Sequence, residues 1–242
     1  MDGVGGPAGT AGGSEVEDLR FSDDRIWRLR QARVDPNVRL LTHPLIQQAL
    51  TSAREVQADG AAFARLVSEI AAMMAYEIVR DEPTEPLEVA TPFGTAMGAI
   101  LSGEITLVPI LRSGLAMADG IRRIIPQARV AHLGIYRDET SLEPVVYYNR
   151  LPPDIAATHV FVLDAMVATG GSATEAVFAV KRSGAVRIKL LCLVAVAEGL
   201  RRITRQHPDV SIYTAAIDPM LDRNGCIVPG LGDAGERLYG TR

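Results

Sequence analysis

The stretch VFVLDAMVATGGSATEA, residues 160–176, has the composition best suited to chemistry in this chain. Four apolar residues and Asp164 are followed by small residues and glycines, and then by a predicted helix. Ser172 and Glu175 have the S-x-x-E spacing of a capping box, which predicts that the helix begins at Ser172. On this segment alone, an ordinary capped turn between a strand and a helix is an equal alternative to a ligand site.

The predicted turn is suited to binding a phosphate group. The start of a helix leaves backbone amide groups unpaired, and small residues before it let these amides converge on an anion. Gly170 and Gly171 permit a close approach that a Cβ atom would prevent, while Thr169 and Ser172 add hydroxyl groups. Asp164, at the predicted strand end, is placed to accept hydrogen bonds from sugar hydroxyls. The alternative for Asp164 is a strand-end acid that caps a turn.

Two arginines also follow predicted strands. Arg112 lies in LRSG, directly after the apolar run TLVPI, and Arg137 begins the long polar segment after HLGIY. A guanidinium can grip phosphate oxygens with two parallel hydrogen bonds, so both residues are candidate diphosphate ligands. The segment around Arg137 contains a short β-like run, 145–148, followed by prolines, which predicts a hairpin or flap projecting from the sheet. By itself, an arginine at a turn is more often a solvated surface charge.

Apolar, β-branched runs alternate with helical patterns from residue 106 onward. This alternation predicts an α/β fold whose central, mostly parallel sheet is flanked by helices, with ligands bound at the carboxyl ends of the strands. Two amphipathic helices are predicted before it, at 43–56 and 61–81, and residues 219–237, rich in Gly and Pro, are predicted to be largely loop. The predicted strands are 106–110, 128–136, 159–164, 188–197 and 210–218, and the helices between them are 114–126, 172–184 and 198–208.

Composition bounds the class of protein. The 242 residues are 48% hydrophobic but only 5% aromatic, which predicts a large aliphatic core. A net charge of −4 and no basic stripe count against nucleic acid as a partner. The two cysteines fit neither a disulfide framework nor a metal site, no apolar run is long enough to span a membrane, and the N-terminus lacks the pattern of a secretory signal. We therefore expect a cytoplasmic protein with a flexible Gly-rich tail (1–14), an N-terminal extension (15–36) and one domain (37–242).

Four motifs, in order, resemble those of the uracil phosphoribosyltransferases, and the resemblance runs from about Val38 to the C-terminus. It implies a type I phosphoribosyltransferase-like fold with a flexible β-hairpin flap and a small hood. The motifs are the diphosphate loop VPILRSG, the flexible loop GIYRDETSLEPVVYYNRLP, the phosphoribosyl-diphosphate (PRPP) motif VLDAMVATGGS and the uracil-binding segment AAIDPMLDRNGCIVPGLGDAGERLYGT.

The resemblance implies an enzyme that transfers ribose 5-phosphate from PRPP to N1 of uracil. It implies catalytic roles for Arg137 and Asp233. It also implies Mg²⁺ held through PRPP and water without direct protein ligands, leaves activation by GTP open, and predicts a homo-oligomer, either dimer or tetramer. The implied PRPP-binding residues are Arg112, Arg137, Asp164, Ala165, Met166, Val167, Ala168, Thr169, Gly170, Gly171, Ser172 and Asp233, and the uracil-binding residues are Ile227, Gly232, Asp233 and Ala234.

Two departures from the family pattern affect the expected site. Ala165 stands where the family usually has proline, and Cys226 where it usually has tyrosine. We expect Cys226 either to leave space beside the base or to be a small buried residue whose gap a neighbour fills. The competing functions are a regulatory nucleotide-sensing or RNA-binding protein on the same scaffold, and a phosphoribosyltransferase for a modified pyrimidine or a purine. The single acid in the PRPP motif, Asp164, disfavours purines.

Overall fold

The computed structural model describes residues 35–138 and 143–241, and its centre is a mixed β-sheet. The strands of this sheet are β1 (Val38–Leu40), β4 (Ile105–Leu111), β5 (Arg129–Val130), β6 (Leu133–Arg137), β7 (Pro144–Asn149), β8 (His159–Val167), β9 (Arg187–Val196) and β10 (Ser211–Asp218). Their order is β1-β10-β9-β8-β4-β6-β7, with β5 paired to β4. Every pair is parallel except β6–β7, so the predicted mostly parallel sheet is confirmed.

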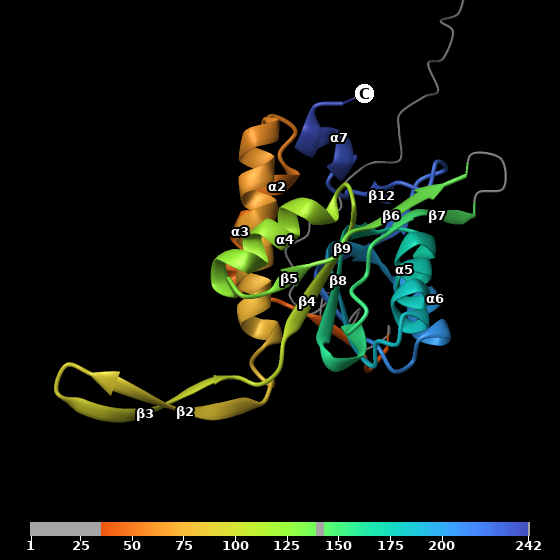
Figure 1. Cartoon of the computed structure of the whole chain (residues 1–242). Helices are drawn as coiled ribbons and strands as arrows, with labels where there is room; N and C mark the ends of the chain where they lie inside the picture. The colour runs from red at the N-terminus through yellow and green to blue at the C-terminus, as the bar shows by residue number, and fades with distance from the viewer. Residues whose placement is uncertain (1–34, 139–142, 242) are drawn as a thin grey trace, which may run out of the picture.

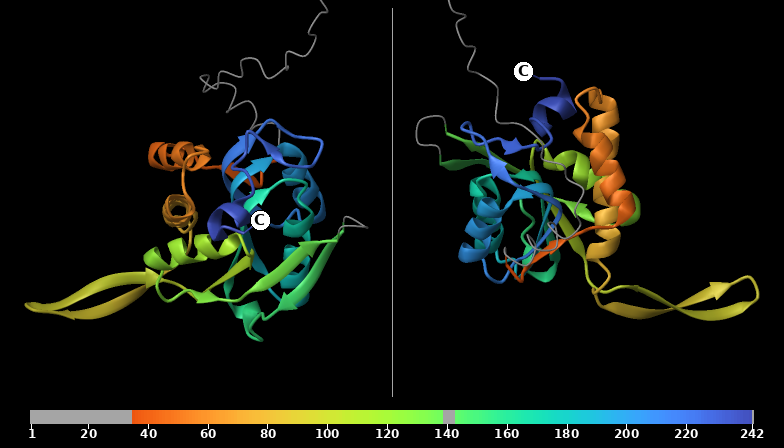
Figure 2. Two further views of the ribbon diagram at one scale, coloured as in Figure 1. Left: turned by 90° about the horizontal axis from the view of Figure 1, so that it is seen from above. Right: turned by 180° about the vertical axis from the view of Figure 1, so that it is seen from behind.

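Helices cover both faces of the sheet, as Figures 1 and 2 show. Side chains alternate across the central strands: Phe161 and Leu163 pack into one apolar cluster, and Val160 and Val162 into the other. Burial on both faces explains why these strands are continuous apolar runs in the sequence. The helices are α2 (Pro44–Arg54), α3 (Gly60–Ile78) and α4 (Gly114–Ile124) on one face, and α5 (Gly171–Arg182) and α6 (Ala197–Gln206) on the other.

The flap expected around Arg137 is confirmed as the β6–β7 hairpin. One detail differs from the sequence prediction, because the run 128–136 forms two short strands, β5 and β6, instead of one. Both pair with β4, which requires the chain to bend between Val130 and Leu133. The turn of the flap, residues 139–142, lies outside the described part of the chain.

A long two-stranded hairpin leaves the body of the protein, and the hydrophobic pattern did not predict it. It is formed by β2 (Thr84–Thr91) and β3 (Gly94–Leu101), which pair only with each other. All eight residues of β2 are exposed, as are those of β3 except Leu101. In Figure 1 the hairpin extends away from the sheet and both helical layers.

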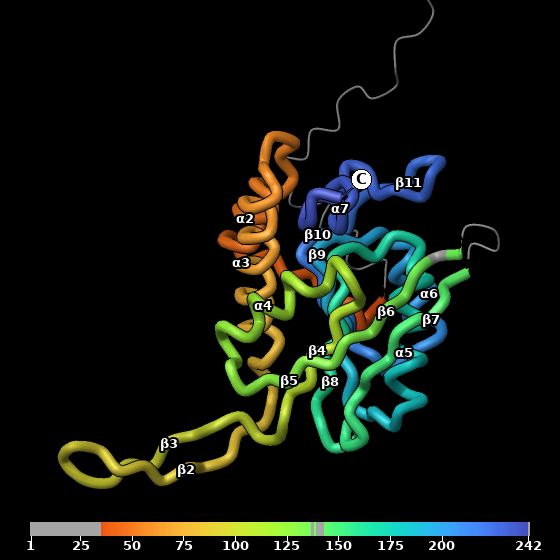
Figure 3. The backbone as a smooth tube through the Cα atoms, turned by 45° about the horizontal axis from the view of Figure 1, so that its top comes forward, coloured from red at the N-terminus to blue at the C-terminus, as the bar shows by residue number. Residues whose placement is uncertain are grey.

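The C-terminal segment forms a hood over the carboxyl edge of the sheet (Figure 3). It contains the small antiparallel pair β11 (Met220–Leu221) and β12 (Ile227–Val228), followed by α7 (Ala234–Tyr239). The segment was predicted to be largely loop from its Gly and Pro content, and strands of two residues are too short to give a hydrophobic period. A short 3₁₀ turn, η1 (Ile155–Ala157), precedes β8. The predictions for 1–14 and for nearly all of 15–36 concern residues that the structure does not describe. Among the residues that it does describe, no helix is long and apolar enough to cross a membrane.

Close packing of α4 on α3 gives a test of the helical layer. A Cβ atom on Gly120 would lie 2.0 Å from the carbonyl oxygen of Ser68, so Gly120→Ala must push the two helices apart. We expect it to lower the free energy of unfolding by about 1–3 kcal/mol, the usual cost of overpacking. Urea unfolding measures the change.

The matched control is Gly98→Ala in the exposed hairpin, where the nearest atom to the new Cβ would be 3.5 Å away. That variant should unfold within about 0.5 kcal/mol of the parent. Equal stability of the two variants would contradict the close α3–α4 contact.

Candidate active site

A polar cleft lies where the parallel strands end, at the edge predicted to bind ligands. Its volume is about 280 Å³. Three of its walls come from the residues that follow β4, from β6, and from the turn between β8 and α5. Its lining residues are Ile110, Leu111, Ser113, Ile135, Asp164, Met166, Val167, Ala168, Thr169, Gly170, Gly171, Ser172, Ala173 and Gly225. The structure thus brings the predicted PRPP-binding residues Asp164 and 166–172 together around one opening, whereas the side chain of Ala165 is buried in the core.

The turn from β8 to α5 leaves the start of the helix without a side-chain cap. Gly170 is the N-cap residue and has a left-handed backbone, with φ of 77°. The predicted capping box is wrong: the helix begins one residue earlier, at Gly171, so Ser172 already lies in its first turn, and Glu175 pairs with Arg182 at 2.6 Å. The first amides of α5 are therefore not satisfied by a protein side chain, as an anion site requires.

Asp164 is held at the end of β8 in a buried position, with 9% of its surface exposed. Burial raises the pKa of its carboxyl group from the ordinary 3.8 to about 6, while hydrogen bonds from the Met166 backbone and Ser113 act in the opposite direction. The hydroxyl of Ser113 donates to Asp164 Oδ1 at 3.3 Å, which links the loop after β4 to the end of β8. Ser113 was not among the predicted site residues, although it directly follows Arg112, a predicted diphosphate ligand.

Arg112 contacts the C-terminal hood. Its guanidinium donates to Thr241 Oγ1 at 3.0 Å and lies 5.5 Å from the centre of the Tyr239 ring, and the Tyr239 hydroxyl donates to its carbonyl oxygen at 3.3 Å. A Cβ on Gly235 would lie within 4 Å of both Arg112 and Asp233. Two predicted site residues from distant parts of the chain are therefore neighbours. Arg112 is not among the residues that line the cleft of about 280 Å³.

Arg137 is the last residue of β6, and its backbone pairs with Pro144 of β7. This position is at the outer end of the β6–β7 hairpin, beyond Gly134, the last residue of β6 that pairs with β4. Its role as a diphosphate ligand stays a prediction.

The predicted uracil-binding residues lie in the hood, outside the cleft lining. Ile227 and Ala234 have buried side chains, and Gly232 has a left-handed φ of 71°. Asp233 is the N-cap of α7, where its Oδ1 accepts a hydrogen bond from the Glu236 amide at 2.9 Å. Their assignment to the base stays a prediction.

Cys226 is exposed, so the expectation of a small buried residue is wrong. It lies in the turn between β11 and β12, and its amide donates to Asp222 Oδ1 at 2.8 Å. Its neighbour Gly225 lines the cleft. Cys226 is therefore exposed to solvent, which the motif in the sequence did not indicate.

An ion pair that the sequence patterns did not predict fixes the hood to the body. Asp218, whose side chain is 1% exposed, binds Arg54 of α2 through two hydrogen bonds of 2.8 and 2.7 Å. Asp218 also accepts from the Gly230 amide at 2.8 Å, and Arg54 donates to the Gly230 carbonyl at 2.7 Å. The pair therefore clamps the backbone just before the predicted uracil-binding turn. The available signal was an acid at the end of a predicted strand, the same signal that identified Asp164.

The residues that line the cleft are compatible with a metal ion that binds together with a phosphorylated ligand. Within the described ranges, no cluster of three or more His, Cys, Asp or Glu could hold a metal ion, and Asp164 is the one carboxylate among the cleft-lining residues. Mg²⁺ prefers oxygen ligands, keeps several waters and is often bound by one or two carboxylates plus substrate phosphates. An Mg²⁺–diphosphate ligand is therefore compatible with the residues present.

The arrangement of a mostly parallel sheet, flap, uncapped phosphate-type loop and C-terminal hood confirms the expected type I phosphoribosyltransferase fold class. The sequence profile described as "Uracil phosphoribosyltransferase" matches residues 40–241. A curated uracil phosphoribosyltransferase of Enterococcus faecalis is 50% identical over 204 residues, which are 84% of this chain and 98% of that protein. That of Oceanobacillus iheyensis is 50% identical over 207 residues, covering 85% and 99%.

Among solved structures, the AQ2163 protein of Aquifex aeolicus is similar, with a TM-score of 0.81 and 36% identity over 84% of this chain and 98% of that one. The chain belongs to the uracil phosphoribosyltransferase family.

The burial of Asp164 gives a stability prediction with a defined sign. Because the folded-state pKa of about 6 is above the ordinary 3.8, ionised Asp164 destabilises the fold. The cost develops as the pH rises from about 4 to 6, and above that range it approaches about 3 kcal/mol. We therefore expect Asp164→Asn to increase the free energy of unfolding at pH 8 more than at pH 5, as measured by urea unfolding.

The control for this prediction is Asp209→Asn. Hydrogen bonding to Lys181 is the main cause of the lowered pKa of Asp209, so its replacement should not stabilise the protein at pH 8. Destabilisation of the Asp164→Asn variant at pH 8 would contradict the raised pKa.

Proposed function

We propose that this enzyme transfers ribose 5-phosphate from PRPP to N1 of uracil, giving uridine monophosphate (UMP) and diphosphate. The observation that carries the proposal is the convergence, in a member of this family, of the uncapped α5 start, buried Asp164 and Arg112 at one edge of the sheet. In this assignment the 5-phosphate binds the amides at the start of α5. The ribose hydroxyls donate to Asp164, and the diphosphate binds Arg112 and Arg137.

The chemistry needs charge stabilisation more than a strong nucleophile. The bond between the anomeric carbon and the diphosphate oxygen breaks, the bond to uracil N1 forms, and the N1 proton is lost. The transition state resembles an oxocarbenium ion, as in glycoside hydrolysis. An ionised Asp164 beside the ribose favours that positive charge, and its preformed position requires no rearrangement during the reaction.

The base is proposed to bind in the hood. Uracil offers acceptors at O2 and O4 and a donor at N3, a pattern that backbone groups of Ile227, Gly232 and Ala234 can match without charged side chains. Asp233 is proposed to contact PRPP. Asp233 lies near Arg112, and its carboxylate accepts a hydrogen bond from the Glu236 amide. Both contacts would hold the carboxylate in place for this role. The Arg54–Asp218 clamp would keep these backbone groups in place while the base binds.

Mg²⁺ is proposed as the cofactor, bound through the diphosphate and water. When bound, it neutralises charge on the leaving diphosphate. A cytoplasmic location is proposed because both cysteines are unpaired, one of them exposed. A GTP titration of the same activity tests whether this nucleotide is an activator.

The reaction is tested by incubating the enzyme with PRPP, Mg²⁺ and a panel of bases, followed by identification of the products. We expect UMP from uracil only with a divalent metal, and no product from hypoxanthine or guanine. Excess chelator should abolish turnover. Purine turnover at an efficiency comparable with uracil, or full activity in chelator, would contradict the proposal, and a protein that only senses nucleotides would give no UMP.

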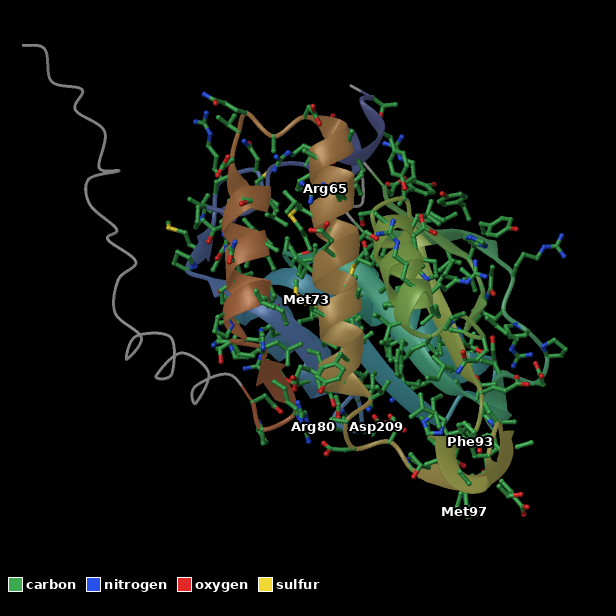
Figure 4. The ribbon with its side chains drawn as sticks, turned by 90° about the vertical axis from the view of Figure 1, so that its left-hand side faces the viewer. Arg65, Met73, Arg80, Phe93, Met97 and Asp209 are labelled. Carbon is green, nitrogen blue, oxygen red and sulfur yellow. The ribbon has the colours of Figure 1, made fainter. Side chains whose placement is uncertain are left out.

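We also propose that the enzyme is a homo-oligomer whose subunits meet through the β2–β3 hairpin. An isolated two-stranded hairpin is at best marginally stable in water. This one exposes Leu87, Val89, Phe93, Met97 and Ile100, and Figure 4 labels Phe93 and Met97 on it. Apolar side chains grouped on a projecting element mark an interaction surface.

A groove on the outer side of α2 and α3 offers a matching surface on a second copy. Its volume is about 580 Å³, and Leu45, Leu66 and Met73 contribute apolar side chains to it. Figure 4 shows Arg65 and Met73 on the face of α3 that borders this groove.

The assembly is tested by measuring the molar mass in solution by light scattering. The double variant Phe93→Asp with Met97→Asp should shift the mass from an oligomer to a monomer, because it charges the apolar surface of the hairpin. Val186→Asp, at another exposed apolar position, is the control and should keep the parental mass. A parental mass for the double variant would exclude the hairpin as the contact.

A further inference from the structure

Helix α6 approaches the proposed phosphate loop more closely than side chains would permit. A Cβ on Gly199 would lie 2.2 Å from the carbonyl oxygen of Ala168, and a Cβ on Gly170 would lie 2.6 Å from the carbonyl oxygen of Gly199. Two glycines on separate elements therefore allow direct backbone contact. The first turn of α6 forms the back of the loop that precedes α5.

This contact directs the side chain of Arg202 to the start of α5. Arg202 follows Gly199 by three residues and lies on the same face of α6. The position that a Cβ on Gly171 would take is 3.6 Å from Arg202 Nη1 and 3.9 Å from its Cζ. Gly171 is the first residue of α5, so the guanidinium touches the loop beside the unpaired amides.

The charge of Arg202 is not balanced within the described part of the chain. Glu198 precedes it by one helical turn, in the favoured orientation for an ion pair, yet among the described residues no ion pair joins the two. By contrast, Lys181 and Arg182 at the other end of α5 pair with Asp209 and Glu175 at 2.6 Å each. The first turn of α5 carries no acid either.

We propose that Arg202 is a further phosphate-binding residue, which supplies the positive charge for the 5-phosphate of PRPP and of UMP. The inference rests on the proposed function for the identity of the ligand. Arg112 and Arg137 serve the diphosphate at the other end of PRPP, so the two ends of this substrate are held by separate arginines. A flexible, solvent-exposed side chain next to the loop can close over a dianion after it binds and open to release UMP.

The test separates the two ends of the substrate. Arg202→Ala should raise the KM for PRPP and the inhibition constant of UMP about tenfold, the usual effect of removing one charge-assisted contact. The KM for uracil and the inhibition constant of diphosphate should stay within twofold. Arg202→Lys should keep part of the affinity for UMP, and Arg202→Glu should lose more than Arg202→Ala, because the sign of the charge decides the effect.

Arg201→Ala is the matched control, since Arg201 is an exposed arginine of the same helix that, unlike Arg202, is not among the nearest neighbours of Gly170 or Gly171. It should bind UMP as the parent does. Thermal stabilisation by inorganic phosphate provides a readout that does not need turnover, and it should fall in Arg202→Ala but not in Arg201→Ala. UMP inhibition within twofold of the parent in Arg202→Ala would overturn the inference, whereas a parent that makes no UMP would overturn the proposed function instead.

Discussion

The register of β8 between β4 and β9 is the constraint on which the site depends. Leu163 pairs with Pro109 of β4 and with Leu191 of β9, so the three strands run in step and end at the same edge. The loop after β4, the loop after β8 and the start of α6 after β9 are consequently neighbours in space. A slip of one residue in β8 would exchange its two buried faces and move Asp164 to the other side of the sheet.

The two edges of the sheet differ in how their polar groups are satisfied. At the amino edge, Glu82 accepts from Lys189 at 2.5 Å and lies 2.8 Å from His159 Nδ1, so a buried acid is fully partnered where the hairpin joins the body. At the carboxyl edge, Asp164 is buried with a raised pKa and α5 begins without a side-chain cap. A buried acid with a raised pKa and helix amides without a cap reduce the stability of the fold and at the same time prepare the site for a charged ligand.

The hood is held by charges, because it has little core of its own. The Arg54–Asp218 pair fixes the backbone near Gly230, while Arg237 donates to the carbonyl oxygens of Ala53, Leu231 and Glu55. Arg237 also lies 3.9 Å from the ring centre of Phe63. Short segments such as β11 and β12 contribute few hydrogen bonds, so arginines from two directions supply the order that the predicted base site needs.

The α/β class, strands β4, β8, β9 and β10 and helices α2 to α6 were predictable from the sequence, because their apolar periodicity follows from burial against the sheet, whereas the predicted strand 128–136 is divided into β5 and β6. The cleft-lining run from Met166 to Ser172 was also identified, because its glycine and hydroxyl residues at a strand end occur together with three further motifs in the family's order. The sequence could not place the β2–β3 hairpin, whose apolar side chains face no core in this chain, or the true start of α5, which depends on the left-handed backbone of Gly170. Only the tertiary structure joined Arg54 to Asp218 and Arg202 to Gly171, because each contact forms between elements far apart in the chain and is decided by how the helices pack.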